Sequence, residues 1–243
     1  MTDDILFHAA DGVGTITLNR PQVLNALTPE MIAAMHRTLD DWAADPAVRV
    51  VLLKGAGKAF CAGGDIRAVR QLSLEGRHDE NRRFFSTEYD LDFATSVFPK
   101  PYLALIDGIC MGGGMGLAMH GGYRVVTERA VLAMPETMIG FFPDVGGTHS
   151  MAHLPGGIGM YLGLTGARVS AADALYCGLA THFLPAEELA EFEAALRRDP
   201  SGLVSLFAAL PKATGDSALA RHRGEIDTAF ADADLPAIFA RLA

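Results

Sequence analysis

The chain has 243 residues and half of them are hydrophobic, which is enough for one sizeable core or one core with a small appendage. Lys and Arg number 20 against 29 Asp and Glu, so the net charge is −9, and no basic stripe exists to favour a nucleic-acid partner. The three cysteines lack metal-site spacing, and no apolar run of membrane-spanning length or basic leader is present. These features predict a cytoplasmic protein with reduced thiols, no metal and no membrane partner.

The first half of the chain alternates predicted strands with predicted helices. Residues 14–19 are expected to form a strand. Thr28, placed before a proline, predicts the N-cap of a helix. That helix is amphipathic, because apolar side chains recur three and four positions apart at Ile32, Met35, Leu39 and Trp42. Short apolar runs over residues 48–53 and 102–106 are typical of buried parallel strands.

Weaker strand patterns continue this alternation at residues 125–126 and 131–134. Ser170 and Asp173 resemble a capping box at the start of a short helix, and residues 179–184 are expected to form a last strand. Strands that alternate with helices predict an α/β fold built from crossover connections.

The last quarter of the chain has no strand pattern. Helices are predicted over residues 187–198 and 225–242, with a linker over residues 210–216. We therefore expect a core domain over residues 1–185 and a helical C-terminal region over residues 186–243.

Two carboxylates stand in an otherwise apolar stretch between Ala130 and Thr148, namely Glu136 and Asp144. A lone buried carboxylate costs several kcal/mol unless it is paired, hydrogen-bonded or protonated. Two of them in a water-poor pocket can position water, take its proton or attack a carbonyl carbon. For Asp144 alone, Pro-Asp before Gly-Gly-Thr favours a turn or a helix N-cap. For Glu136, which has no Lys or Arg nearby in sequence, the pattern favours a functional role.

Two glycine-rich segments, residues 60–66 and 107–116, each follow a predicted strand and open a predicted helix. Adjacent glycines at a helix start let a ligand approach bare backbone N–H groups. Two such segments can together form an oxyanion hole, although close helix packing or a tight turn would explain either one. Their spacing does not match a dinucleotide-binding fingerprint, a Walker A loop or a nucleophile elbow.

Glu88 lies on an apolar stripe at helical spacing, formed by Phe84, Phe85, Leu91, Thr95 and Phe98. Most carboxylates at such places sit at the edge of the stripe and reach solvent, while a minority point into a pocket. His149 and His153 are four residues apart, but no helix-embedded glutamate separates them as in a zinc motif. They are interpreted as ordinary structural or surface histidines.

Together these segments resemble the enoyl-CoA hydratase/isomerase (crotonase) family over about residues 5–185. Strand order, both glycine segments and Pro135-Glu136 fall in the family's order. The resemblance implies a spiral of ββα turns followed by a helical C-terminal region. It also implies an acyl-CoA substrate, no cofactor beyond the CoA of that substrate, and a homo-oligomer that is a trimer or hexamer.

The resemblance also implies site residues. The backbone N–H groups of Gly64 and Gly113 would be the oxyanion-hole donors. The CoA adenine and pantetheine site would be lined by Asn25, Ala26, Ala62, Gly63, Asp65 and Ile66.

Within the family, the likeness is greatest to hydrolases of 3-hydroxyisobutyryl-CoA, which act in valine breakdown. It is carried by residues 59–67, 111–114, 133–137, 140–147 and 180–183. In those hydrolases the residues that match Glu88, Gly113, Glu136 and Asp144 contact substrate or take part in catalysis. By this likeness, Glu136 would activate water or attack the thioester. Asp144 would orient the substrate hydroxyl or assist proton transfer, and Glu88 would bind the polar end of the substrate.

Two departures from the family pattern matter. Hydratases carry a second catalytic glutamate where this chain has Gly116. Because a general acid–base group contributes roughly 10²–10⁴-fold, hydration of a C=C bond should be poor here. The matching hydrolases are also longer, so this chain would be a short form or a fragment. An enoyl-CoA hydratase/isomerase and an acyl-CoA-binding protein with an incomplete site are the alternative functions.

Overall fold

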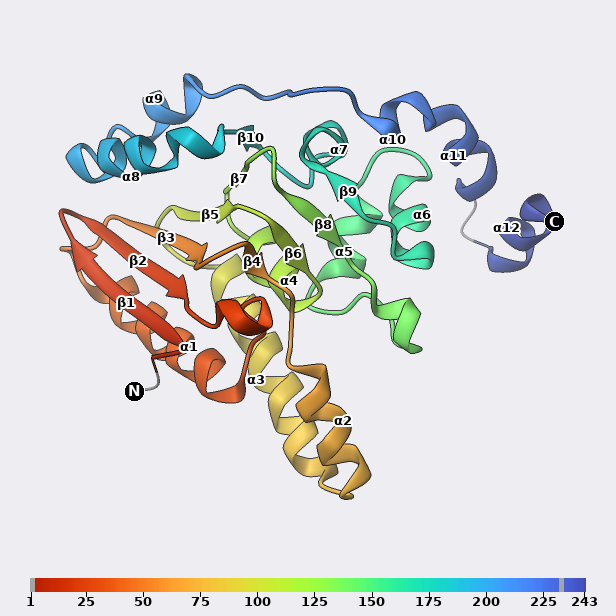
Figure 1. Ribbon diagram of the computed structural model, residues 1–243, viewed down its shortest axis with the longest axis horizontal. Helices are drawn as coiled ribbons and strands as arrows, with labels where there is room; N and C mark the ends of the chain where they lie inside the picture. The colour runs from red at the N-terminus through yellow and green to blue at the C-terminus, as the bar shows by residue number, and fades with distance from the viewer. Residues whose placement is uncertain (1–2, 232–233) are drawn as a thin grey trace.

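Two β-sheets form the centre of the molecule in the computed structural model, which describes residues 3–231 and 234–243 (Figure 1). The strands in that part of the chain are β1 (Ile5–Ala10), β2 (Val13–Leu18), β3 (Val50–Gly55), β4 (Ala59–Cys61), β5 (Tyr102–Ile106), β6 (Ile109–Met111), β7 (Tyr123–Val126), β8 (Val131–Ala133), β9 (Val169–Ser170) and β10 (His182–Phe183). One sheet has the order β1-β2-β3-β5-β7-β10, and the other has the order β4-β6-β8-β9.

Successive strands from β3 to β8 belong alternately to the two sheets. Those of the six that pair with each other within a sheet run parallel. The chain therefore winds as a spiral in which each turn adds one strand to each sheet and then a helical segment. This confirms the predicted α/β fold with a spiral of ββα turns. The strand β1 was not predicted. It pairs antiparallel with β2 across Asp11-Gly12, whose φ values of 53° and 82° are those of a tight hairpin turn.

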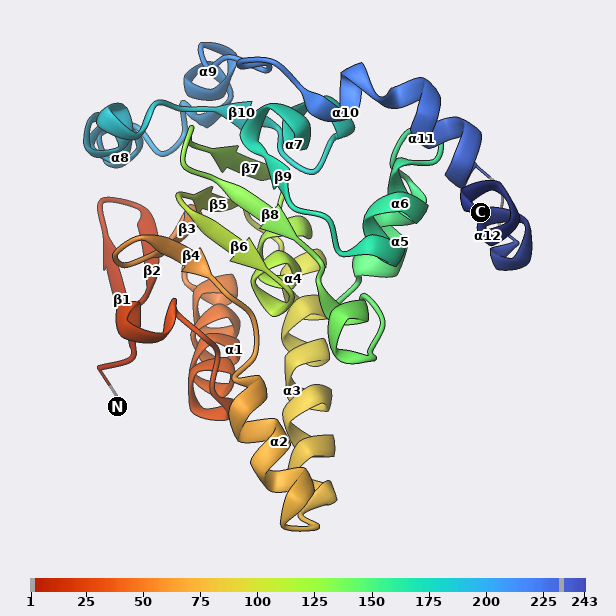
Figure 2. The same ribbon diagram turned by 45° about the vertical axis from the view of Figure 1, so that its right-hand side comes forward.

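Helices surround the sheets. They are α1 (Pro29–Ala44), α2 (Ile66–Leu74), α3 (His78–Ser96), α4 (Gly113–Met119), α5 (Gly147–Ala152), α6 (Ile158–Thr165), α7 (Ala171–Cys177), α8 (Leu189–Arg198), α9 (Leu203–Ala208), α10 (Ala218–Arg221), α11 (Arg223–Phe230) and α12 (Leu235–Leu242). Three short 3₁₀ segments, η1 (Pro21–Val23), η2 (Glu136–Ile139) and η3 (Ala186–Glu188), connect them. Figures 1 and 2 show α2 and α3 side by side, projecting from the sheets as a pair. No helix in the described ranges is long and apolar enough to cross a membrane.

The central strands of the six-stranded sheet, β3 and β5, are buried on both faces, as the continuous apolar pattern of β3 predicts. Val51 and Leu53 belong to the large core that also contains side chains of α1, α3 and α4. Val50 and Leu52 face the other way and pack in a second cluster with Phe192 of α8 and other residues of α8 and α9. Helices of the C-terminal region therefore cover one face of this sheet, and the proposed domain boundary at residue 185 stays a prediction.

The helix predicted over residues 225–242 is wrong as a single element, because α11 ends at Phe230 and α12 begins at Leu235. Pro236 stands in the first turn of α12, where its missing N–H costs nothing, whereas inside one long helix it would break the hydrogen-bond ladder. The strand predicted over residues 179–184 is shorter, since only the two residues of β10 pair with β7.

Ser170 and Asp173 form the predicted capping box at the start of α7. The carboxylate of Asp173 does more than cap this helix. Its Oδ2 accepts hydrogen bonds from the N and Oγ of Ser170, and its Oδ1 accepts from Ser217 Oγ at 2.8 Å and from Leu219 N at 2.9 Å. The buried carboxylate of Asp173 thus links α10 of the C-terminal region to α7 of the core through hydrogen bonds.

Replacing Asp173 by Ala should lower the free energy of unfolding by about 3 kcal/mol, because it removes charge-assisted hydrogen bonds and leaves buried donors without an acceptor. Urea unfolding followed by circular dichroism measures the change. The variant Ser217→Ala removes one of these bonds together with the N-cap bond from Ala220 N to Ser217 Oγ, and it should cost about 2 kcal/mol. An Asp173→Ala protein as stable as the wild type would contradict this account.

Candidate active site

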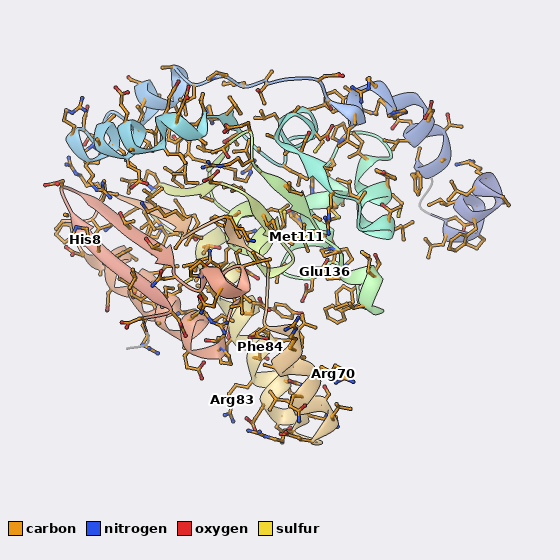
Figure 3. All side chains as sticks on the ribbon, viewed as in Figure 1. His8, Arg70, Arg83, Phe84, Met111 and Glu136 are labelled. Carbon is orange, nitrogen blue, oxygen red and sulfur yellow. The ribbon has the colours of Figure 1, made fainter. Side chains whose placement is uncertain are left out.

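A cavity of about 580 Å³ opens between the two glycine segments, the base of the α2–α3 pair and residues 135–144. Figure 3 shows Glu136, Met111 and Phe84, which come from separate parts of the chain, gathered in the same region. The ionisable side chains that line the cavity are Glu88, Glu136 and Asp144, and no Lys or Arg lines it among the described residues. The spiral thus places the predicted carboxylates in one pocket.

The two glycine segments touch each other at this cavity. A Cβ built on Gly63 would lie 2.9 Å from the carbonyl oxygen of Met111 and 3.1 Å from the N of Gly113. Gly63 also has a φ of 96°, a region that side-chain-bearing residues rarely adopt. Only glycine therefore allows β4 and β6 to bring their following loops into backbone contact.

The backbone N–H groups of Gly64 and Gly113 are both left without an acceptor among the described residues. Leu27 bonds to the residues on either side of Gly64: its carbonyl oxygen accepts from Asp65 N, and its own N–H donates to Gly63 O. The N–H of Gly64 therefore points the opposite way. Gly113 is the first residue of α4, where a helix leaves its N–H groups unbonded. A Cβ on Gly113 would lie 3.4 Å from the N of Gly64. Two such donors side by side can bind one oxygen that develops negative charge.

Asn25 supports the backbone around β4 through hydrogen bonds of its side chain, and it does not line the cavity. Its side chain is fully buried, and its Nδ2 donates to the carbonyl oxygens of Ala56, Ala59 and Phe60 at 2.9, 2.7 and 3.2 Å. Its Oδ1 accepts from Arg20 N at 2.8 Å. The side-chain amide of Asn25 is thus fully bonded to the backbone around β4, and contact between Asn25 and CoA stays a prediction.

The other predicted CoA-contact residues divide into two groups. Ala62, Gly63 and Ile66 line the cavity, whereas Ala26 and Asp65 do not. Asp65 instead accepts a hydrogen bond from Ala68 N as the N-cap of α2. Binding of CoA by any of these residues stays a prediction.

Glu88 is buried, with only 3% of its surface exposed, although its position on the stripe favoured the edge and solvent. Its Oε1 has no hydrogen-bond partner and lies beside the two glycines, so that a Cβ on Gly113 would collide with it. Burial raises the pKa of Glu88 to about 8, and the negative charges of Asp144 and Glu136 add to the shift. At neutral pH this side chain is mainly a neutral acid that can donate a hydrogen bond.

Glu136 begins η2 and is buried. Its Oε1 lies 2.9 Å from where Gly112 would carry a Cβ, and its Oε2 has no hydrogen-bond partner. Burial raises the pKa of Glu136 to about 7, a backbone hydrogen bond partly opposes the shift, and the charge of Asp144 adds to it. A carboxyl group with this pKa is present in both protonation states near neutral pH, as proton transfer requires.

Asp144 lines the same cavity, and its Oδ2 accepts a hydrogen bond of 2.7 Å from the hydroxyl of Tyr89. Its alternative role as a helix N-cap is wrong, because Gly146 holds that position before α5. Burial raises the pKa of Asp144, and the Tyr89 hydrogen bond partly offsets this. The next residue, Val145, has a φ of 45°, a costly conformation for a β-branched residue, and its carbonyl accepts from His120 Nε2 at 3.0 Å.

Sequence analysis missed Tyr89 and Asp92, which lie on α3 next to the predicted Glu88. Asp92 is 4% exposed, and burial raises its pKa to about 9, with further contributions from the charges of Glu88 and Asp144. A signal was present, since Phe84, Glu88 and Asp92 recur every fourth residue and no Lys or Arg stands three or four positions from either carboxylate. The apolar rim of the cavity at Met138, Ile139 and Phe141 was also missed.

His149 and His153 do not belong to a metal cluster, since no group of His, Cys, Asp or Glu in the described ranges could hold an ion. His153 Nδ1 donates to the carbonyl oxygen of His149 at 2.7 Å, and both residues lie at the protein surface rather than in the cavity. Their interpretation as ordinary surface histidines agrees with this geometry.

Comparison with known proteins identifies the family. The pattern described as enoyl-CoA hydratase/isomerase matches residues 13–243. The chain belongs to this family, the crotonase family. A carnitinyl-CoA dehydratase structure from Mycobacterium thermoresistibile aligns with a TM-score of 0.92 at 42% identity, covering 99% of this chain and 70% of that one. An enoyl-CoA hydratase structure from Rhodobacter sphaeroides aligns with a TM-score of 0.91 at 40% identity, covering 99% and 69%.

Curated relatives point to another activity in the same family. The 3-hydroxyisobutyryl-CoA hydrolase of Gallus gallus is 50% identical over 191 residues, which cover 78% of this chain and 49% of the relative. The 3-hydroxyisobutyryl-CoA hydrolase 1 of Arabidopsis thaliana is 45% identical, covering 80% and 51%. The enzyme of Rattus norvegicus is 42% identical, covering 94% and 62%. This chain thus spans about half the length of most of these relatives.

The buried carboxyl groups should make the protein less stable as pH rises from about 6.5 to about 9. Glu88, Asp92 and Glu136 have folded pKa values of about 8, 9 and 7, well above ordinary values near 4. Between the ordinary pKa and the raised pKa of each group, the folded chain keeps a proton that the unfolded chain has released. Each group therefore lowers the free energy of unfolding by up to about 1.4 kcal/mol per pH unit. Burial lowers the pKa of His120 and His182 below 6.5, so these histidines make the protein more stable as pH rises toward 6.5. This opposing effect on stability ends at about pH 6.5, where the window begins.

Urea unfolding at several pH values across this window measures the slope. Glu88→Gln should flatten it, while the matched change Asp41→Asn on the exposed side of α1 should leave it unchanged. A free energy of unfolding that stays level or rises across the window would refute the burial argument.

Proposed function

We propose that this protein hydrolyses the thioester of 3-hydroxyisobutyryl-CoA, or of a closely related β-hydroxyacyl-CoA, to the free acid and CoA. One observation carries the proposal: two unbonded glycine N–H groups and an unpartnered buried glutamate converge on one cavity. The names of the curated relatives support the choice of reaction and substrate.

In this mechanism the N–H groups of Gly64 and Gly113 hold the thioester oxygen. As the carbonyl carbon becomes tetrahedral, that oxygen gains negative charge, and the two donors are already oriented toward it. Each such donor contributes roughly 10²–10³-fold to the rate in comparable sites. The low-dielectric surroundings of Phe84 and Phe85 strengthen the interaction.

Glu136 supplies the acid–base or nucleophilic group. As a base it takes one proton from water while the oxygen bonds to the carbonyl carbon, and it then gives that proton to the sulfur as the C–S bond breaks. As a nucleophile it attacks the carbon itself and releases thiolate, leaving a mixed anhydride that water cleaves. Its pKa of about 7 suits both routes at neutral pH.

Glu88 and Asp144 recognise the polar end of the acyl group. Neutral Glu88 can donate a hydrogen bond to a substrate oxygen, and Asp144, held by Tyr89, can accept one from a hydroxyl. An apolar wall that includes Phe141, whose ring centroid lies 5.9 Å from that of Phe85, provides contact for the carbon chain. This combination favours a short acyl chain that carries a hydroxyl group.

Enoyl-CoA hydration is the second candidate, favoured by the name of the Rhodobacter structure and opposed by Gly116, which leaves α4 without a carboxylate. It predicts turnover of crotonyl-CoA. Acyl-CoA binding without thiol release would instead indicate a binding protein. The cytoplasmic location and the trimer or hexamer stay predictions, and the animal relatives are named as mitochondrial.

Glu136→Gln should reduce thiol release from 3-hydroxyisobutyryl-CoA by roughly 10²–10⁴-fold, because the amide can neither take a proton nor attack the thioester. A thiol-trapping assay over a panel that includes crotonyl-CoA and acetyl-CoA measures the rate and the specificity. Asp144→Asn should affect the hydroxylated substrate more than acetyl-CoA. Near-normal hydrolysis by Glu136→Gln would exclude this mechanism.

Gly113→Ala should lower kcat by roughly 10²–10³-fold, because its methyl group would collide with Glu88 Oε1 and sit next to the Gly64 N–H. Gly122→Ala is the matched control, since nothing lies within 4 Å of the added Cβ there. Equal activity of the two variants would show that the glycine pair does not bind the thioester oxygen.

A further inference from the structure

Most buried polar side-chain atoms without a hydrogen-bond partner belong to the active-site glutamates and to two further residues on α3 and β5. Seven such side-chain atoms occur in the described residues, and five belong to Glu136, Glu88, Asp92 and Tyr102. Buried polar atoms that lack a protein partner are ordinarily bonded to ordered water or to a ligand. The first two residues belong to the site described above, whereas Asp92 and Tyr102 have no role in the proposed reaction.

Asp92 lies one helical turn beyond Glu88 on α3, and it lines a second cavity but not the active-site cavity. This second cavity of about 530 Å³ is lined by Asp92, His120 and His149, and Asp144 lines both this cavity and the active-site cavity. Neither carboxylate oxygen of Asp92 has a partner. Asp92 thus lies one helical turn from the active-site residue Glu88 and lines a separate cavity that it shares with Asp144.

The side chain of Asp92 also occupies space next to α4. A Cβ on Gly116 would lie 2.9 Å from Asp92 Oδ1 and 2.6 Å from Val145 Cβ. A glutamate could not be placed at position 116 without moving both neighbours. The chain thus carries a carboxyl group next to position 116, but this group comes from α3 rather than from α4.

The titratable groups that face Asp92 come from every side. They are Glu88 and Tyr89 on its own helix, Asp144 in the loop before α5, Tyr102 on β5, and His120 and His149 around the second cavity. Burial and the negative charges of Glu88 and Asp144 raise the pKa of Asp92 to about 9. At neutral pH it is therefore a neutral carboxylic acid with one donor and one acceptor oxygen.

Thioester hydrolysis at neutral pH produces a proton that must leave the buried site. Thioester and water give a carboxylic acid and a thiol, and the acid then ionises to a carboxylate and one proton. No Lys or Arg lines the active-site cavity among the described residues, and three carboxyl groups line it. The proton must therefore pass along carboxyl groups or water before the next turnover.

We propose that Asp92 is a positioning residue that passes this proton from Glu88 and Asp144 to the second cavity. An incoming proton binds one oxygen of the carboxylic acid while the proton on the other oxygen leaves to water, so that Asp92 ends each turnover neutral. The inference rests on the proposed hydrolysis and assigns a proton exit that is separate from the substrate entrance.

Asp92→Asn tests the relay, because an amide has the same shape but cannot exchange a proton between its two ends. We expect kcat for thiol release to fall about tenfold with KM changed less than twofold, since substrate contacts remain. The solvent deuterium isotope effect on kcat should rise, and the alkaline limb of the kcat–pH profile should move. Formate should partly restore kcat in Asp92→Gly by filling the vacated position.

Asp90→Asn, an exposed change on the same helix, is the control and should leave all of these values unchanged. Wild-type kcat, pH profile and isotope effect in a folded Asp92→Asn protein would overturn the relay while leaving hydrolysis intact. A lower kcat without a changed isotope effect or pH profile, and without formate rescue, would mean a structural role only. Absence of thiol release by the wild type would instead refute the proposed function itself.

Discussion

The backbone contact between the loops after β4 and β6 is the constraint on which the site depends. Gly63 and Gly113 approach so closely that no side chain fits between them, and this brings the N–H groups of Gly64 and Gly113 together. Asn25 fixes one side of the contact by bonding three carbonyl oxygens around β4, and Asn25 itself has a φ of 58°. Backbone geometry of this kind is set by the two sheets before any substrate arrives, which is the preorganisation that charge stabilisation requires.

The same spiral places carboxyl groups where their charges are least tolerated. Glu88, Glu136 and Asp144 meet in a cavity without a lining cation in the described part of the chain. The charge of Asp144 therefore disfavours ionisation of Glu136, and both charges disfavour ionisation of Glu88. Val145 adds backbone strain beside Asp144, in a conformation that costs of order 1–3 kcal/mol. Such features lower stability and persist only where the surrounding structure imposes them. Their concentration around one pocket is itself an argument that the pocket has a function.

Sequence patterns predicted the parts of the site that local chemistry determines. The glycine segments, the isolated Glu136 and the capping box of Ser170 need only their neighbours in sequence. The burial of Glu88 depends on how α3 is rotated against the sheets, and periodicity does not fix that rotation. The structural bonding of the Asn25 amide could not be predicted for a related reason: the direction of its side chain follows from left-handed φ values at Leu24 and Asn25 that the sequence does not display.

The location of its carboxyl groups separates this chain from the hydratase pattern, which places a second glutamate at the position of Gly116. A second glutamate on α4 would share the work of adding water across a double bond, and Gly116 together with Val145 and Asp92 leaves no room for it. The extra carboxyl group instead comes from α3, where it interacts with Glu88 and Asp144. In the proposed hydrolysis, Glu136 would act alone on water or on the thioester, and the other carboxyl groups would be free to bind a hydroxyl group or to move protons. Because that reaction needs one reactive carboxylate beside an oxyanion hole, a carboxyl group on α3 instead of α4 supports the proposal of hydrolysis over hydration.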